Sequence, residues 1–292
     1  MRAAPIDLSR TVLGRRFQNP IILAAGTAGF GRELDGIMDL DRLGGLVTKA
    51  VSLEPRHGNV PPRVAEFPGG MLNSVGLANP GLQRVRTDDL PWLAARLARA
   101  AILVNVVGFR VDEYAEVVGG LQGVPGIAAF ELNLSCPNTS AGGIEFGADP
   151  GCVARIVSLC RARTRLPLIA KLSPVLPDLG GMAVVARNAG ADAITVVNTL
   201  PGSLAAENGT PRLGNGYGGV SGPVLLPVGL LAVQRVVERA GVPVIGVGGV
   251  RTAADVRQYL AAGADLVGIG TAALADPRLP ERIVRHLERG HG

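Results

Sequence analysis

The chain has 292 residues, 47% of them hydrophobic, and a formal net charge of +5, a length that allows two average domains or one barrel domain. No segment approaches the roughly 18 uninterrupted apolar residues of a membrane span, and the first residues lack the apolar core of a signal peptide, so we expect a soluble, cytoplasmic protein without membrane contact. The basic residues form no continuous run with interleaved aromatics, which argues against nucleic-acid binding.

Short apolar, β-branched runs alternate with longer amphipathic segments along the whole chain, which is typical of βα units around a parallel sheet. Eight strands are predicted, at residues 20–24, 45–49, 102–106, 129–133, 168–171, 193–198, 244–247 and 266–269. Helices are predicted between them at residues 89–100, 112–120, 150–165, 223–240 and 252–262. Eight such units without a Pro/Ser-rich linker favour a single (β/α)8 TIM-barrel domain over residues 1–292.

Two stretches are too long for a minimal barrel. Residues 51–81 follow the second predicted strand, and residues 200–222 follow the sixth. Long connections in a compact domain are usually lids or binding loops. Because loops after the strands of a barrel lie on its catalytic face, both insertions are predicted to cover the same mouth.

Polar residues end several of the predicted strands. These are Lys49, Asn105, Asn133, Lys171 and Asn198. Parallel barrel strands all point their ends the same way, so these side chains should converge and could bind a planar, anionic ligand with many hydrogen-bonding groups. Lys49 and Lys171 are also the only lysines among 29 basic residues, which suggests positions where a guanidinium cannot replace an ammonium. The alternative is that each Asn simply starts a turn after its strand.

Glycine-rich turns follow the last two predicted strands. One contains Gly248 and Gly249, and the other contains Gly270 and Thr271. Backbone N–H groups of glycine can approach an anion closely, and barrel phosphate sites often follow strands seven and eight. No GxGxxG follows the first strand and neither lysine follows a glycine, so a phosphorylated cofactor in a barrel mouth is favoured over a Rossmann dinucleotide.

The three cysteines, Cys136, Cys152 and Cys160, form no CxxC pair and are too few for a four-thiolate iron–sulfur cluster. Cys152 and Cys160 lie eight apart on a predicted helix and are interpreted as small buried hydrophobes. Cys136 lies three residues beyond a strand end, in a loop at the mouth where a nearby cation could favour its thiolate. The histidines are scattered, so no Cys–His pair and no metal site is predicted, and Cys136 would act alone as a base.

Several long motifs, in order and at family spacing, resemble class 1B dihydroorotate dehydrogenases. They are NSVGLANPG at residues 73–81, ELNLSCPN at 131–138, GGIEFG at 142–147, GTAGFG at 26–31, GGVSGP at 218–223 and the terminal GVGG and GIGT turns. The likeness extends from about residue 10 to residue 275. Cysteine in the base position resembles class 1, since class 2 enzymes carry serine there.

The resemblance implies roles for matching residues. Catalytic roles fall on Cys136, Lys49 and Lys171. The substrate, dihydroorotate or orotate, would contact Lys49, Asn73, Ser74, Val75, Gly76, Leu77, Asn133, Asn198 and Thr199. FMN would contact Ala25, Lys49, Ala50, Asn105, Asn133, Lys171, Val197, Gly222, Gly248, Gly249, Gly270 and Thr271. The chain departs from the family at Ala24-Ala25, where many relatives have serine, and at LPGSLAAENGT, residues 200–210.

The resemblance also implies the reaction, in which Cys136 removes a proton from C5 of dihydroorotate and the flavin N5 takes a hydride from C6. Relatives of class 1B pass electrons to a second subunit that carries FAD and a [2Fe–2S] cluster and reduces NAD+. This chain lacks the cysteines and the nucleotide fingerprint for that step, so we expect a homodimer with one such partner per protomer, a heterotetramer.

Other functions remain open at this point. A related FMN barrel could use fumarate or act on another dihydropyrimidine, which acceptor assays would distinguish. A non-catalytic phosphate-binding barrel would purify without flavin absorption. A tRNA-modifying flavin barrel also uses cysteine chemistry, but the chain has no basic patch or nucleic-acid domain.

Overall fold

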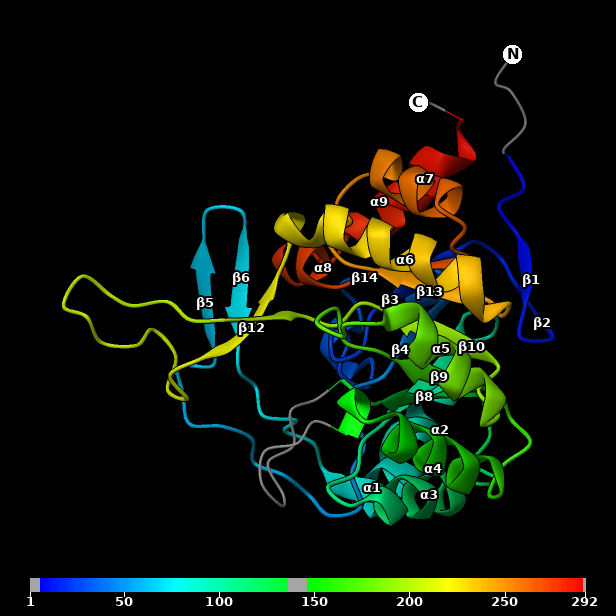
Figure 1. Cartoon of the computed structure of the whole chain (residues 1–292). Coiled ribbons are helices and arrows are strands. Elements are labelled where there is room, and N and C mark those ends of the chain that lie inside the picture. The colour runs from blue at the N-terminus through cyan, green and yellow to red at the C-terminus, as the bar shows by residue number, and fades with distance from the viewer. Residues whose placement is uncertain (1–5, 136–145, 291–292) are drawn as a thin grey trace.

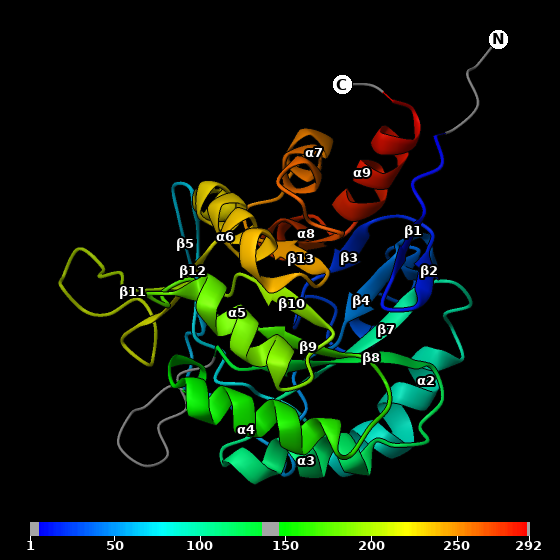
Figure 2. The ribbon, with the colours of Figure 1, turned by 45° about the vertical axis from the view of Figure 1, so that its right-hand side comes forward.

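The computed structural model describes residues 6–135 and 146–290. Eight parallel strands close into a barrel, in the order β3-β4-β7-β8-β9-β10-β13-β14 around the ring. The strands are β3 Ile21–Leu23, β4 Gly45–Val47, β7 Ala101–Val106, β8 Ile127–Asn133, β9 Leu168–Lys171, β10 Ala193–Val196, β13 Val244–Val247 and β14 Leu266–Ile269. Helices pack around the outside of this ring (Figures 1 and 2). The predicted (β/α)8 barrel is therefore confirmed.

All eight predicted strands are present, but three predicted ends lie too far along the chain, by one residue in β3 and by two residues in β4 and β10. The strand β4 ends at Val47 and β10 ends at Val196. Lys49 and Asn198 therefore lie in the loops after their strands, where the backbone N–H of Lys49 donates to Gly29 O at 2.8 Å, outside the ladder. The Lys49 N–H thus pairs with the loop after β3, a partner that the apolar run of β4 does not reveal.

Side chains alternate across each strand, so every second residue faces the barrel axis. Aliphatic side chains fill the lower interior, and they are Ile22, Val47, Leu103, Ala129, Ile169, Ala193, Ile245 and Leu266. Val12 and Phe17 pack against this group from an antiparallel hairpin, β1 Arg10–Val12 and β2 Arg15–Phe17. The hairpin, which the sequence analysis missed because its strands have only three residues each, closes the N-terminal end of the barrel.

The helices of the outer layer are α1 Gly81–Arg84, α2 Leu90–Ala94, α3 Val111–Gly120, α4 Pro150–Arg161, α5 Leu179–Asn188, α6 Leu226–Ala240, α7 Ala253–Ala261, α8 Thr271–Ala275 and α9 Leu279–Glu288. The predicted helix at 89–100 is misplaced, because a π-helical turn at Val85–Asp89 joins α1 to α2 and the helix ends at Ala94. Proline has no N–H to donate within a helix, and its ring clashes with the carbonyl of the preceding turn. The π turn lies directly before α2, which contains Pro91 near its start. The helices α1, α5, α8 and α9 lie outside the predicted helix ranges.

Capping residues fix several helix ends. The Asp149 carboxylate accepts from the Cys152 N–H at 2.6 Å, with Pro150 in the first turn of α4. Thr252 and Asp255 form a reciprocal capping box at the start of α7. Gly241 ends α6 in a left-handed conformation with φ of 61°. The helices after β8 and β13 therefore start at defined points above the barrel mouth.

The two long insertions pair with each other. The first contains the hairpin β5 Val64–Phe67 and β6 Gly70–Asn73, and the second contains β11 Leu200–Gly202 and β12 Gly218–Ser221. Together they form one antiparallel sheet in the order β11-β12-β6-β5, here called the roof sheet. Figure 1 shows it to the left of the barrel. The prediction that both insertions meet over one mouth is confirmed by the β6–β12 pairing.

No helix within residues 6–135 and 146–290 has the length and apolar content needed to span a bilayer.

Candidate active site

A layer of polar side chains lies above the aliphatic interior of the barrel. Asn105, Glu131, Lys171 and Thr195 each lie two residues beyond an inward-facing aliphatic residue of the same strand. All four are buried, with exposed fractions of 0%, 1%, 6% and 1% in that order. Strand register places Asn105 beside Glu131 and Thr195 beside Lys171. These residues, called the polar layer below, form a continuous arc on four neighbouring strands.

Glu131 lies at the centre of the polar layer. Its Oε1 accepts from Asn105 Nδ2 at 2.7 Å, and its Oε2 accepts from Thr195 Oγ1 at 2.8 Å. Lys171 Nζ lies 3.9 Å from Oε1. Glu131 and Thr195 were not among the predicted site residues. An acidic residue at an inward position of an otherwise apolar strand is nevertheless a recognisable signal, because a buried charge needs partners.

A second group of polar side chains joins the ends of β8 and β10. Ser135 Oγ donates to Asn133 Oδ1 at 3.1 Å and accepts from Asn198 Nδ2 at 2.7 Å. Tyr114 OH donates to the Asn133 carbonyl at 3.0 Å, which holds that end of β8. The structure thus brings Asn133 and Asn198 together through Ser135, as their predicted convergence requires.

Cys136 lies outside the described residues. It follows Ser135 directly in the chain. Ser135 is 6% exposed and hydrogen-bonded to both Asn133 and Asn198, so the chain is fixed at the mouth one residue before the cysteine.

The loop after β6 is fastened to the loop after β4. Asn79 Nδ2 donates to Ser52 Oγ and to the Leu77 carbonyl, both at 2.8 Å, and Asn79 Oδ1 accepts from the Gly81 N–H at 2.9 Å. Ser52 follows the half-buried Lys49 by three residues. Residues 77–81 therefore lie beside the chain segment that follows Lys49.

The predicted substrate residues of this loop are individually held. Asn73 Nδ2 donates to the Gly219 carbonyl of β12 at 3.1 Å. Asn59 donates from its side chain to Ser74 Oγ at 2.8 Å and from its backbone to the Val75 carbonyl at 3.1 Å. The loop then bends at Gly76 and Leu77, both with left-handed φ angles of 72° and 57°. Thr199, directly before β11, packs against Gly219 of β12, where a Cβ atom would lie 2.0 Å from Thr199 Oγ1.

Two glycine turns lie side by side at the ends of β13 and β14, whose register pairs Val247 with Gly268. Gly248 and Gly249 have φ angles of 130° and 74°, and a Cβ on Gly249 would lie 2.5 Å from Leu226 N. Such conformations and contacts require glycine, which leaves a concave backbone surface. Gly270 and Thr271 begin α8 in the neighbouring turn.

The roof sheet is hydrogen-bonded to the two turns that contain Gly248, Gly249, Gly270 and Thr271, here called the glycine cradle. Thr271 Oγ1 donates to Ser221 Oγ of β12 at 2.8 Å. Gly222 follows with φ of 100°, and a Cβ there would lie 2.8 Å from Gly70 Cα, so the two insertions touch backbone to backbone. The remaining predicted cofactor residues, Ala25, Ala50 and Val197, lie just beyond the ends of β3, β4 and β10.

Gly249→Ala is expected to lower the free energy of unfolding by about 1–3 kcal/mol, because a Cβ forces the left-handed turn away from Leu226. Urea unfolding measures the change. Gly209→Ala is the matched control, since Gly209 has a similar φ of 80° but no atom within 4 Å of its Cβ position. An equal loss of stability in both variants would contradict a steric need for glycine at position 249.

Cys160 is fully buried in α4, and burial raises the pKa of its thiol to about 12. Its interpretation as a core residue is confirmed. Cys152 is only half-buried, in the first turn of α4, so that interpretation is incomplete there. Desolvation first, and then the Asp149 carboxyl, raise its pKa as well. Neither thiol is activated as a nucleophile.

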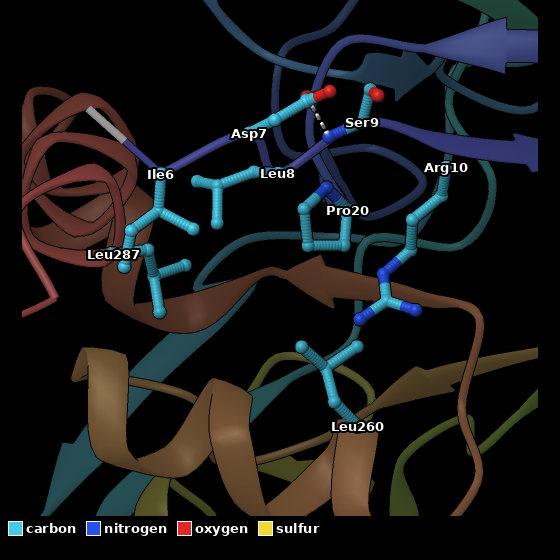
Figure 3. Close-up of a pocket in the computed structure, with 8 residues that line it drawn as sticks. All are labelled: Ile6, Asp7, Leu8, Ser9, Arg10, Pro20, Leu260 and Leu287. Atoms are coloured by element: carbon cyan, nitrogen blue, oxygen red, sulfur yellow. Dashed lines mark hydrogen bonds between the residues drawn. The ribbon is translucent and has the colours of Figure 1, made fainter. Parts of the chain in front are cut away.

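Two cavities lie outside the candidate site. One of about 330 Å³ lies at the N-terminal side of the barrel, lined by Ile6, Asp7, Leu8, Ser9, Arg10, Pro20, Leu260 and Leu287 (Figure 3). A second, of about 100 Å³, is lined by Ser52, Leu53, Glu54, Pro55, Arg56, Phe109 and Glu113. Neither includes a residue of the polar layer. Within the described ranges, no three His, Cys, Asp or Glu side chains gather as metal ligands would.

Comparison with known proteins agrees with this arrangement. The family model described as dihydroorotate dehydrogenase matches residues 7–290. A protein of Desulforudis audaxviator named "Dihydroorotate dehydrogenase B (NAD(+)), catalytic subunit" is 46% identical over 281 residues, which cover 95% of this chain and 90% of that protein. A protein of the same name from Trichlorobacter lovleyi is 44% identical over 275 residues, with 94% and 90% covered. Among solved structures, the Eimeria tenella dihydroorotate dehydrogenase in complex with ferulenol shares the fold, with a TM-score of 0.80 at 22% identity over 96% of this chain and 83% of that chain.

Proposed function

The chain belongs to the dihydroorotate dehydrogenase family, and we propose that the polar layer and the glycine cradle of its barrel hold FMN beside the substrate. The protein is an oxidoreductase that oxidises dihydroorotate to orotate in pyrimidine biosynthesis. The family is flavin-dependent. We further propose that residues 1–292 form a single FMN-binding domain that works in the cytoplasm.

One observation carries the assignment of FMN to this place. Asn105 is fully buried, and its Oδ1 has no hydrogen-bond partner among the described residues. A buried polar atom without a partner is costly, so this oxygen fits a site that a bound polar ring completes. The glycine cradle supplies the matching place for a phosphate, after the seventh and eighth barrel strands.

The residues that would hold FMN surround Asn105 Oδ1 and the glycine cradle. In our proposal they are Ala25, Lys49, Ala50, Asn105, Asn133, Lys171, Val197, Gly222, Gly248, Gly249, Gly270 and Thr271. Dihydroorotate would bind Lys49, Asn73, Ser74, Val75, Gly76, Leu77, Asn133, Asn198 and Thr199, between the roof sheet and the barrel. Ala24 and Ala25 place no hydroxyl at the end of β3, so only backbone groups there can form hydrogen bonds with the cofactor.

FMN, when bound, would accept at N5 the hydride that leaves C6 of dihydroorotate. The chain would supply the proton acceptor, with Cys136 taking the C5 proton. Ser135, hydrogen-bonded between Asn133 and Asn198, supports this role because it fixes the chain next to the cysteine. Lys49 and Lys171 would stabilise negative charge, an effect that grows in a buried site.

A stopped-flow mixture with dihydroorotate tests the proposal. The purified yellow protein should bleach near 450 nm in a single turnover without an electron acceptor. A colourless protein that does not bind added FMN would refute the cofactor assignment. A yellow protein that stays oxidised with dihydroorotate, while another dihydropyrimidine bleaches it, would refute the substrate.

The electron acceptor gives a separate prediction. We propose that the chain forms a homodimer that binds one FAD and [2Fe–2S] subunit per protomer, a heterotetramer. The name "Dihydroorotate dehydrogenase B (NAD(+)), catalytic subunit" of the relatives supports a separate partner. The purified chain should therefore reduce an artificial dye but turn over less than a hundredth as fast with NAD+ or fumarate. Rapid NAD+ reduction by the chain alone would contradict the need for a partner.

A further inference from the structure

We propose that Glu131 is a positioning residue that fixes the donor and acceptor pattern offered to the flavin ring. It makes Asn105 present its amide oxygen, and Lys171 its ammonium, to one imide edge of that ring. This inference rests on the proposed FMN site, and the experiment below separates the two. Glu131 itself is 1% exposed and lies beneath the site, so it acts through its neighbours.

The orientation of Asn105 follows from the chemistry of a carboxylate. An amide side chain can point either its oxygen or its nitrogen at a neighbour, and the neighbour decides which. A carboxylate only accepts hydrogen bonds, so the 2.7 Å contact with Glu131 Oε1 must be made by Asn105 Nδ2. The oxygen of Asn105 is thereby directed elsewhere, and it is the atom that has no partner among the described residues.

Lys171 is held differently. Its Nζ lies 3.9 Å from the same Oε1, which is within ion-pair distance but longer than a hydrogen bond. Oε1 already accepts from Asn105, and Oε2 already accepts from Thr195 Oγ1 at 2.8 Å. The carboxylate therefore neutralises the ammonium without taking its N–H groups. These groups stay available to a carbonyl oxygen.

The acceptor and the donor are next to each other, because Asn105 and Lys171 both approach Oε1. A ligand edge that matches them has an N–H group beside a carbonyl. The isoalloxazine ring of FMN has this arrangement at its imide, where N3–H lies between two carbonyl groups. Asn105 Oδ1 would accept from N3–H, and Lys171 would donate to the adjacent carbonyl.

Selectivity between two flavins tests the role of Glu131. The probes are FMN and 3-methyl-FMN, which lacks the N3–H donor, titrated into apo-protein with binding followed by flavin fluorescence. Wild type should prefer FMN by roughly 10- to 100-fold, the effect of leaving a buried acceptor unpaired. In Glu131→Gln, the new amide can donate to Asn105 Oδ1, so the Asn105 amide can turn over and direct its nitrogen at the flavin. The preference for FMN over 3-methyl-FMN should then fall to within about threefold.

Thr195→Val is the matched control. It removes the other hydrogen bond to Glu131 but leaves a carboxylate that must still take the Asn105 N–H, so the wild-type preference should persist. A purely structural role would lower both flavin affinities together and leave their ratio unchanged. An unchanged ratio in Glu131→Gln, or an equal fall in Thr195→Val, would overturn the inference. Wild type that binds FMN without any preference would overturn the inference alone, whereas wild type that binds no FMN would overturn the proposed function as well.

Discussion

Replacing Cys136 with alanine is expected to slow flavin reduction by dihydroorotate about 10²- to 10⁴-fold, the usual size of a general-base contribution. Binding of the product orotate should stay within a few fold of wild type, because the proposed substrate contacts, which come from Lys49, residues 73–77, Asn133, Asn198 and Thr199, do not include Cys136. Single-turnover bleaching of the flavin measures the rate, and the spectral change on orotate addition measures binding.

Cys152→Ala serves as the control for this experiment. Cys152 lies in the first turn of α4 with a raised thiol pKa, so its removal should leave reduction within about twofold of wild type. If Cys136→Ala reduced its flavin at a near wild-type rate, Cys136 would have no part in proton removal. A loss of orotate binding equal to the loss of rate would instead indicate a role in binding.

Lys171→Ala is expected to lower the free energy of unfolding by about 3–5 kcal/mol, since it leaves the Glu131 carboxylate buried without a cation. The two side chains are 8% and 1% exposed, so water screens this loss very little. Urea unfolding of the apo-protein measures the change. Flavin reduction by dihydroorotate should also fall sharply, because the cation proposed to stabilise the reduced ring is absent.

The double variant Lys171→Met with Glu131→Gln separates these two effects. Removing both charges leaves a neutral, similarly filled interior, so stability should recover most of what the single variant loses. Flavin reduction should remain impaired, because the ammonium is still missing. Full flavin reduction in Lys171→Ala would exclude Lys171 from the chemistry, and a stability loss under about 1 kcal/mol would show that Glu131 does not depend on it.

The barrel could be predicted because its signal is repeated. Each βα unit carries its own apolar run and amphipathic segment, and errors at individual ends do not change the count of eight. The π-helical turn before Pro91 could not be predicted, because the local pattern there starts a helix at Asp89 and only tertiary packing extends it back to Gly81. The hairpin at β1 and β2 is stabilised by Val12 and Phe17 on the barrel base, a contact between distant segments.

The candidate site was predictable where a polar residue ends or nearly ends an apolar strand, but not at Glu131, which shares the polar layer with Asn105 and Lys171. Asn133 and Lys171 end their strands and Asn105 is one residue from the end of β7, which marks them as exceptions to the apolar pattern. Glu131 lies inside its strand, so its part depends on which neighbours meet it in the closed barrel. The register that brings Asn105 beside it is a property of strand pairing, and a single sequence does not specify that pairing.

The roof sheet also bears on how the chain folds as it is synthesised. Asn73 of β6 is hydrogen-bonded to Gly219, 146 residues further along. During translation the edge of β6 that pairs with β12 stays unpaired until most of the barrel has been synthesised, since contacts of such sequence separation form late. That edge is only four residues long, which limits its ability to recruit a strand from another nascent chain. Catalytic competence is thus reached near the end of folding, when the second insertion arrives.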